Sequence, residues 1–382
     1  MRTNPLSPRA SAHLDMVRGT AALAVMLEHV RSLFFVNYSH VLTRNSLVGG
    51  AYLLTSLGHQ AVLVFFVLSG FFISRSVLDS FRKSRWSWRV FLVNRLTRLL
   101  LVLVPGLVLC ALWDRVGMIL PEASRFYYQA IPNFGTETIA GNSSVSIFVG
   151  NLLFLQSIFF PSFGSAKPLW SLSYELWYYM LFPILLLVFV SRLPGAKRLA
   201  YAIVGSAIFL MVGRDIALLF LVWLAGAGVG LVHDMRPQFV QRTSAAWYTY
   251  CLGAFGLVGL LVVKVRLKEG LASDFMVAAS FLPAMYVLVE ASSSVVNPAY
   301  AALARMLSSF SYSLYVAHLP LLIFIRTCLG HVPRWEFDFK HIVYGVAIAS
   351  VVAAYSFGIS RLTEARTDVV RRALLRHRKT AT

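Results

Sequence analysis

Four ionisable side chains lie within one apolar stretch near the start of the chain. The stretch from Leu14 to His29 is apolar enough to enter a bilayer, yet it includes Asp15, Arg18, Glu28 and His29. Each such side chain costs at least ~2.5–3.5 kcal/mol in a membrane helix, so these residues usually face a bundle interior and carry function. On a helix, Arg18 and His29 lie about 16 Å apart and within roughly 20° of one face. This spacing predicts a buried site for an anionic ligand.

His29 is the candidate general base of this site. Imidazole is the side chain that most readily accepts a proton from a hydroxyl at neutral pH. We expect Glu28 or Glu175 to orient the ring or balance its charge, and Arg18 to hold a substrate. The alternative is that Arg18 and His29 form a structural pair that joins helices.

A second basic feature is the pair Arg95 and Arg98, which are one helical turn apart. They follow a basic segment, residues 75–89, that we expect on the cytoplasmic side of the membrane. Two guanidinium groups at this spacing suit bidentate binding of phosphate. The alternative is that both side chains snorkel to lipid headgroups.

A third feature lies at the start of the apolar segment 168–190. Ser171 and Glu175 share one helix face there, among aromatic residues that include Trp170 and Tyr174. Aromatic residues at helix ends usually form an interfacial belt, but a belt needs no carboxylate. Hydroxyl and carboxylate groups among aromatic rings also bind sugars, so Trp170, Ser171 and Tyr174 are predicted to contact substrate.

Other motifs have structural interpretations. His318 lies inside an apolar segment, where a structural role is favoured and a functional role is the alternative. Ser69 and Gly70 allow close helix approach, and so do the glycines of residues 226–230, which do not match a dinucleotide fingerprint. No phosphate-binding loop and no cysteine spacing typical of a metal site is found, so no metal is expected.

Composition indicates a polytopic membrane protein. The chain has 382 residues, of which 58% are hydrophobic and 13% charged, and its mean hydropathy is +0.69. These values, with apolar segments repeated along the chain, exclude an ordinary soluble domain. The formal net charge of +19 is assigned to basic loops that set orientation and meet anionic lipid, and no nucleic-acid partner is expected.

Hydropathy predicts an all-α fold of about ten transmembrane helices, with one further re-entrant or short helix at 145–160. The excess of Lys and Arg in alternate loops favours ten spans with both termini cytoplasmic. The predicted organisation is a cytoplasmic tail, a transmembrane domain and a basic cytoplasmic tail, at residues 1–14, 15–362 and 363–382. The ten predicted spans are 15–36, 56–78, 91–113, 168–190, 198–213, 215–232, 246–264, 274–291, 306–326 and 340–361.

Five motifs, in this order, resemble those of the acyltransferase-3 family of integral membrane O-acyltransferases. Each motif is weak alone, but the set is specific and covers nearly the whole chain. The motifs are Leu14-Asp15…Arg18-Gly19 with His29, Phe65-Phe66…Ser69-Gly70-Phe71, Arg95-x-x-Arg98, Trp170-Ser171-Leu172-Ser173…Glu175, and Ser311-Tyr312-Ser313-Leu314-Tyr315…His318.

The resemblance implies transfer of an acyl group, expected to be acetyl, from acyl-coenzyme A to a hydroxyl of a glycan or glycolipid. It makes His29 essential and assigns the arginines to binding of the donor. The acyl group is transferred either directly to the acceptor or through an acyl-enzyme. No permanently bound cofactor is expected, and the expected location is the bacterial cytoplasmic (inner) membrane. The fused esterase-like domain common in the family is not seen, so we expect the chain to act alone, as a homodimer or with an esterase-like partner. The alternative is a non-enzymatic transporter or flippase of a lipid-linked sugar.

Overall fold

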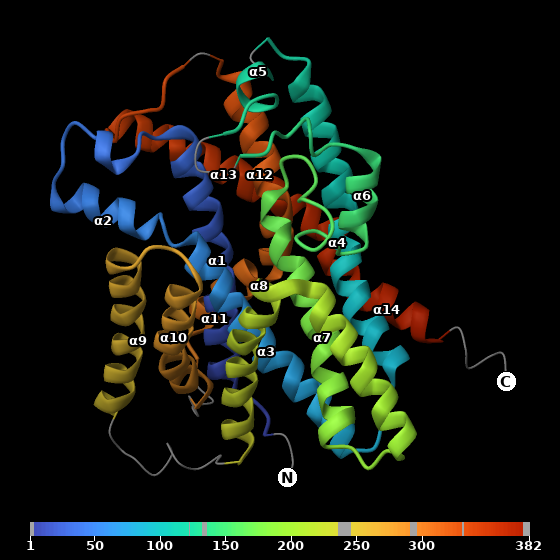
Figure 1. The fold of residues 1–382 in the computed structure, drawn as a ribbon. Coiled ribbons are helices and arrows are strands. Elements are labelled where there is room, and N and C mark those ends of the chain that lie inside the picture. The colour runs from blue at the N-terminus through green and yellow to red at the C-terminus, as the bar shows by residue number, and fades with distance from the viewer. Residues whose placement is uncertain are drawn as a thin grey trace. The chain divides into compact units, whose positions relative to one another are not determined.

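The computed structural model describes residues 4–121, 123–131, 136–235, 246–290, 296–330 and 332–376. Within these residues every extended regular element is a helix, and the only β pairing consists of two isolated bridges. Figure 1 shows the helices in chain order. The α-helices are α1 (Pro8–Phe34), α2 (Ser46–Leu54), α3 (Gly58–Arg82), α4 (Trp88–Met118), α5 (Ala123–Phe126), α6 (Val145–Leu152), α7 (Trp170–Phe189), α8 (Gly195–Met235), α9 (Ala246–Arg266), α10 (Leu271–Glu290), α11 (Pro298–Ser309), α12 (Ser311–Cys328), α13 (Phe339–Leu362) and α14 (Thr367–Arg376).

The chain is an all-helical integral membrane protein. In its described part, six helices are long and apolar enough to cross a membrane, or seven if the bent pair α11 and α12 forms one span. Each of the ten predicted segments falls on a helix, but α1 and α9 are not among these six. The count of ten spans, the domain boundaries and the cytoplasmic position of both termini therefore stay predictions.

Two predicted spans, 198–213 and 215–232, lie on α8, which consists of two helices that meet at a break. The helical backbone breaks at Gly213, whose φ is 78° and ψ is 177°. A residue with a Cβ rarely adopts this positive φ, whereas glycine adopts it at little cost. Nothing lies within 4 Å of the position that a Cβ would take there, so the backbone conformation, and not lack of space, requires glycine.

The segment 145–160 does not form a continuous span. Its helix α6 has eight residues and is about 12 Å long, much shorter than the ~30 Å hydrocarbon core. Phe154 and Ser157 then adopt positive φ values of 58° and 65°, which turn the chain. A short helix at this position agrees with the sequence prediction.

The described contacts divide the chain into two compact units, each assembled from three segments. Unit 1 comprises Met1–Arg18, Val62–Trp86 and Ser171–Arg305. Unit 2 comprises Gly19–Ala61, Ser87–Trp170 and Met306–Thr382.

Small residues let α3 and α8 approach closely within unit 1. A Cβ added at Gly70 would overlap the carbonyl oxygen of Trp223, and one at Gly226 would overlap that of Val67. At Gly228, by contrast, an added Cβ would meet nothing within 4 Å. The interpretation of Gly70 and Gly226 as helix-packing residues is confirmed.

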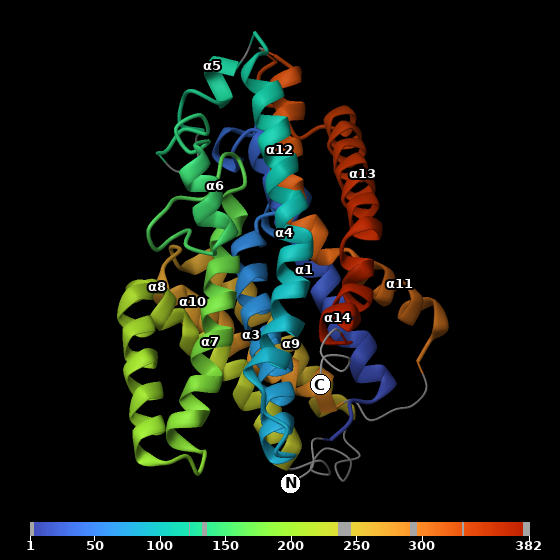
Figure 2. The ribbon, with the colours of Figure 1, turned by 90° about the vertical axis from the view of Figure 1, so that its right-hand side faces the viewer.

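Helices α4 and α12 run side by side in the same direction within unit 2 (Figure 2). The Tyr312 hydroxyl donates to the carbonyl oxygen of Leu99 at 3.3 Å. One helical turn later on α12, Val316 fills the space above Gly106. Further along, Trp113 packs on Phe324 with ring centroids 4.7 Å apart. These three contacts show which residues of α4 lie at the same height as which residues of α12.

Gly226→Ala is expected to destabilise the protein by about 1–3 kcal/mol, because the new methyl group must displace the backbone of α3. Thermal unfolding in detergent measures the effect as a lowered Tm. Gly228→Ala is the matched control and should leave the Tm unchanged or slightly raised. Equal effects of the two substitutions would contradict the close approach at Gly226.

Candidate active site

The predicted base His29, on α1, is in direct contact with a second histidine. Its Nδ1 lies 2.9 Å from Nε2 of His318 on α12, and the ring centroids are 5.0 Å apart. Nδ1 of His318 in turn lies 2.8 Å from the carbonyl oxygen of Leu314. His318 is fully buried, so its ring is held in one orientation.

The hydrogen bonds of this histidine pair assign the protons of both neutral rings. A carbonyl oxygen can only accept, so Nδ1 of His318 carries the hydrogen and its Nε2 is an acceptor. His29 must then donate from Nδ1 to His318. With both rings neutral, His29 carries its hydrogen on Nδ1 and its lone pair on Nε2, which is a form that a general base can use.

For His318 the sequence favours a structural role over a functional one. It lies 289 residues from His29, so no local pattern could reveal the contact. The one available signal was that both histidines occur in apolar segments, where an imidazole needs a hydrogen-bonding partner.

The other predicted residues of α1 also have partners. Arg18 forms an ion pair with Asp15 at 3.6 Å, one turn earlier on the helix. The carboxylate of Glu28 lies against Gly58 at the start of α3, so closely that a Cβ at Gly58 would overlap it. Arg18 and His29 share one continuous helix, as predicted.

Glu175 belongs to a hydrogen-bonded network in unit 1. Its Oε1 accepts from the hydroxyls of Ser69, at 3.2 Å, and Tyr179. Trp223 donates from Nε1 to the Ser69 oxygen at 3.2 Å. The network joins α3, α7 and α8, so Ser69 contributes a hydroxyl as well as a small side chain.

The three predicted substrate-binding residues of 170–174 pack against other side chains. Tyr174 is buried and stacks on Phe66 with a centroid distance of 6.0 Å. Ser171 is also buried, and Trp170 stacks on His59 at 6.5 Å. Their contact with a substrate stays a prediction.

Arg95 and Arg98 lie one turn apart on the continuous helix α4, as predicted. The guanidinium carbon of Arg95 lies 5.7 Å from the ring centroid of Phe91, and Arg98 is exposed. Because α4 and α12 run in parallel, the arginines lie toward the Tyr312 end of α12. The His29–His318 pair comes next along the axis, and Asp114 lies beyond it, next to Trp113.

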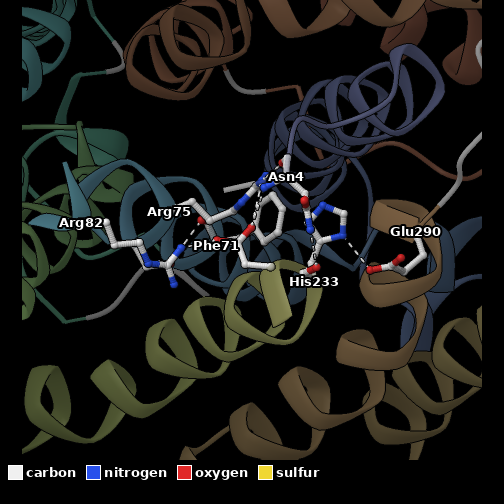
Figure 3. Close-up of polar contacts among 8 residues, drawn as sticks. Asn4, Phe71, Arg75, Arg82, His233 and Glu290 are labelled. Atoms are coloured by element: carbon white, nitrogen blue, oxygen red, sulfur yellow. Dashed lines mark hydrogen bonds and ion pairs between the residues drawn. The ribbon is translucent and has the colours of Figure 1, made fainter. Parts of the chain in front are cut away.

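A second polar cluster, in unit 1, was not predicted (Figure 3). The buried carboxylate of Asp234 accepts from Arg75 at 3.3 Å and from Arg82 at 3.2 Å. Beside it, Nδ1 of His233 lies 2.6 Å from Glu290. The cluster joins the C-terminal ends of α3, α8 and α10, so Arg75 and Arg82 of the basic segment are already paired.

The sequence comparisons identify the family. The model of an acyltransferase domain, Acyl_transf_3, matches residues 11–361, which is nearly the whole chain. The chain belongs to the acyltransferase-3 family. The resemblance recognised from the five motifs is therefore confirmed, and the enzyme class with it.

Two curated relatives are named as peptidoglycan O-acetyltransferases, one of them provisionally. The peptidoglycan O-acetyltransferase OatA of Listeria monocytogenes is 26% identical over 208 residues, which cover 53% of this chain and 28% of the relative. YrhL of Bacillus subtilis, named provisionally as a peptidoglycan O-acetyltransferase, is 25% identical over 337 residues, covering 78% and 49%. The chain thus spans about half or less of the curated relatives it matches. No solved structure matches the chain significantly.

Asp234→Asn is expected to destabilise the protein by about 3 kcal/mol, because it leaves two neighbouring guanidinium groups without their buried carboxylate. The free energy of unfolding in detergent is the measurement. The matched control is Asp368→Asn, whose carboxylate pairs with Arg371 at the surface of α14 and should contribute less than ~1 kcal/mol. A loss no larger than that of the control would contradict the structural role of Asp234.

Proposed function

We propose that this acyltransferase transfers an acetyl group from acetyl-coenzyme A to a hydroxyl of a glycan. The observation that carries the proposal is the hydrogen bond from His29 to His318, which leaves a basic nitrogen on His29. The names of the two relatives support a glycan of the peptidoglycan class as acceptor. The family match favours acyl transfer over the alternative of a transporter.

In the proposed reaction, Nε2 of His29 takes the proton of the acceptor hydroxyl as its oxygen attacks the thioester carbon. The new C–O bond forms, the C–S bond breaks, and the coenzyme A thiolate takes the proton back from the imidazolium. The same base would serve a two-step route through an acyl-enzyme.

His318 is proposed as the positioning residue for this base. A general base must present its lone pair in a defined direction, and the hydrogen bond at Nδ1 of His29 sets the orientation of the ring. Accepting that hydrogen bond also stabilises the imidazolium that forms as the proton is transferred. We propose that Glu28, the neighbouring residue on α1, balances this charge.

The donor is proposed to bind at the Arg95–Arg98 end of α4. Coenzyme A carries several phosphate groups and is kept in the cytosol, and this end follows the basic segment that we expect inside the cell. The arginine pair suits phosphate, while the acceptor glycan would approach from the opposite end. This order fits an enzyme of the bacterial cytoplasmic membrane.

His29→Ala is expected to lower kcat by at least about 100-fold, the usual contribution of a general base. His318→Ala should lower kcat less and change the shape of the pH–kcat profile, because it leaves the base present but unoriented. His318→Gln, which places an acceptor near the former Nε2, should recover part of the loss. The measurement is thioester turnover by purified protein.

His40 is exposed and provides the control. His40→Ala should leave turnover and its pH profile unchanged. Turnover like that of the wild type in His29→Ala would rule out the base. An unchanged pH profile in His318→Ala would reduce His318 to a packing residue.

Arg98→Ala is expected to weaken binding of acetyl-coenzyme A about ten- to a hundredfold, since a charge-assisted hydrogen bond contributes roughly 1.5–3 kcal/mol. Arg98→Lys keeps the charge but loses the planar fork, so it should be impaired less. The apparent donor affinity is the measurement, and Arg192→Ala is the exposed control. If both variants bind the donor normally, these arginines anchor to lipid and the donor site lies elsewhere.

A further inference from the structure

We propose that a cavity beside Asp114 binds one sugar unit of the acceptor glycan, next to the unit whose hydroxyl reacts. The proposal rests on the proposed function, because it takes the acceptor to be a glycan. It assigns a role to the far end of α4, to α6 and to the loop that follows α6.

The cavity is lined by groups that suit a sugar ring. Its volume is about 210 Å³, which favours a single ring over a longer segment. It combines a carboxylate, a guanidinium and two hydroxyls with two aromatic rings, and a sugar presents both hydroxyl edges and an apolar face. These groups belong to Asp114, Arg115, Ser143, Ser144, Phe148 and Phe163.

One wall of the cavity is built around the Asp114 side chain. Its Oδ1 accepts from the Ser165 hydroxyl at 2.6 Å, and its Oδ2 accepts from the Ser165 backbone N–H at 2.9 Å. Gly164 adopts a φ of 51°, and a Cβ there would overlap Oδ2 of Asp114. The loop thus closes tightly over the carboxylate, which fixes the shape of this wall before any ligand binds.

Another part of the lining comes from the start of α6. The Ser144 hydroxyl caps this helix by accepting from the Ile147 N–H at 3.3 Å. Phe148 packs edge-on against Phe163, with ring centroids 5.2 Å apart. These contacts hold an aromatic ring and a hydroxyl of α6 at the cavity.

The groups that can meet a ligand lie in front of the buried carboxylate. Asp114 is 1% exposed, so its hydrogen bonds to Ser165 serve to fix the wall. The exposed guanidinium of Arg115 offers donors, and the hydroxyl oxygens of Ser143 and Ser144 can accept. Donor and acceptor groups of this kind match adjacent hydroxyls on one ring.

The position along the helix axes determines which sugar unit the cavity can hold. Asp114 lies eight residues beyond Gly106, whereas His318 lies two residues beyond Val316 at the same level. At a rise of 1.5 Å per residue, the backbone of Asp114 lies about 9 Å further along the helix axes than that of His318. This exceeds the reach of the reacting ring, so the cavity suits a neighbouring unit.

The test uses the purified full chain, acetyl-coenzyme A, and N-acetylglucosamine oligomers of one to four units as acceptors. Ala111→Phe fills the cavity, because Ala111 is in its lining. Leu112→Phe is the matched control, since Leu112 is its exposed neighbour on α4 and is not in the lining. Phe148→Ala removes one wall and provides a second variant if the larger side chain prevents folding.

In the wild type, the acceptor KM is expected to fall about tenfold from one unit to four, equivalent to ~1.4 kcal/mol. Ala111→Phe and Phe148→Ala should lose this gain. Both should keep the wild-type activity on the single sugar and the wild-type hydrolysis of acetyl-coenzyme A without acceptor. Leu112→Phe should behave like the wild type.

A preference for longer oligomers that survives in both cavity variants would overturn the subsite, and so would a wild type that transfers without any length preference. Both results would leave the proposed function intact. A wild type that hydrolyses acetyl-coenzyme A but acetylates none of the oligomers would overturn the glycan acceptor itself.

Discussion

Polar side chains inside a membrane protein must find their partners on neighbouring helices, because the hydrocarbon core offers none. This constraint explains the contacts that hold each unit together. His29 bonds to His318, Asp234 to two arginines, Glu175 to two hydroxyls and Asp114 to Ser165. Each of these four groups has a partner in a segment that is distant along the chain. The residues that could do chemistry are thus also the residues that specify how the helices pack.

Because α4 and α12 run in parallel, three groups of unit 2 can be placed in order along one axis. The arginine pair, the histidine pair and the Asp114 cavity follow one another along these helices. In the proposed function, a thioester donor and a glycan acceptor approach His29 from opposite ends, and this order is compatible with that. The hydrogen bond between the histidines would then set the orientation of the proposed base between the two substrates.

Much of the fold was predictable because hydropathy and local spacing are sufficient to define helices. The ten apolar segments all fall on helices, the one-turn spacing of Arg95 and Arg98 is realised on α4, and Gly70 and Gly226 pack as predicted. The contacts of the candidate site are less predictable. The position of His29 in an apolar helix singles it out, but its contact with His318 and the Asp234 cluster do not follow from local patterns.

The sequence by itself determined the membrane class, the positions of the helices and, through five ordered motifs, the acyltransferase-3 family. Only the tertiary structure decided which helix faces which, and therefore that His29 pairs with His318 and Arg75 with Asp234. The physical reason is that apolar periodicity records which residues leave water, and spacing records which share a helix face. Neither identifies the partner across an interface, which depends on the packing of surfaces from distant parts of the chain.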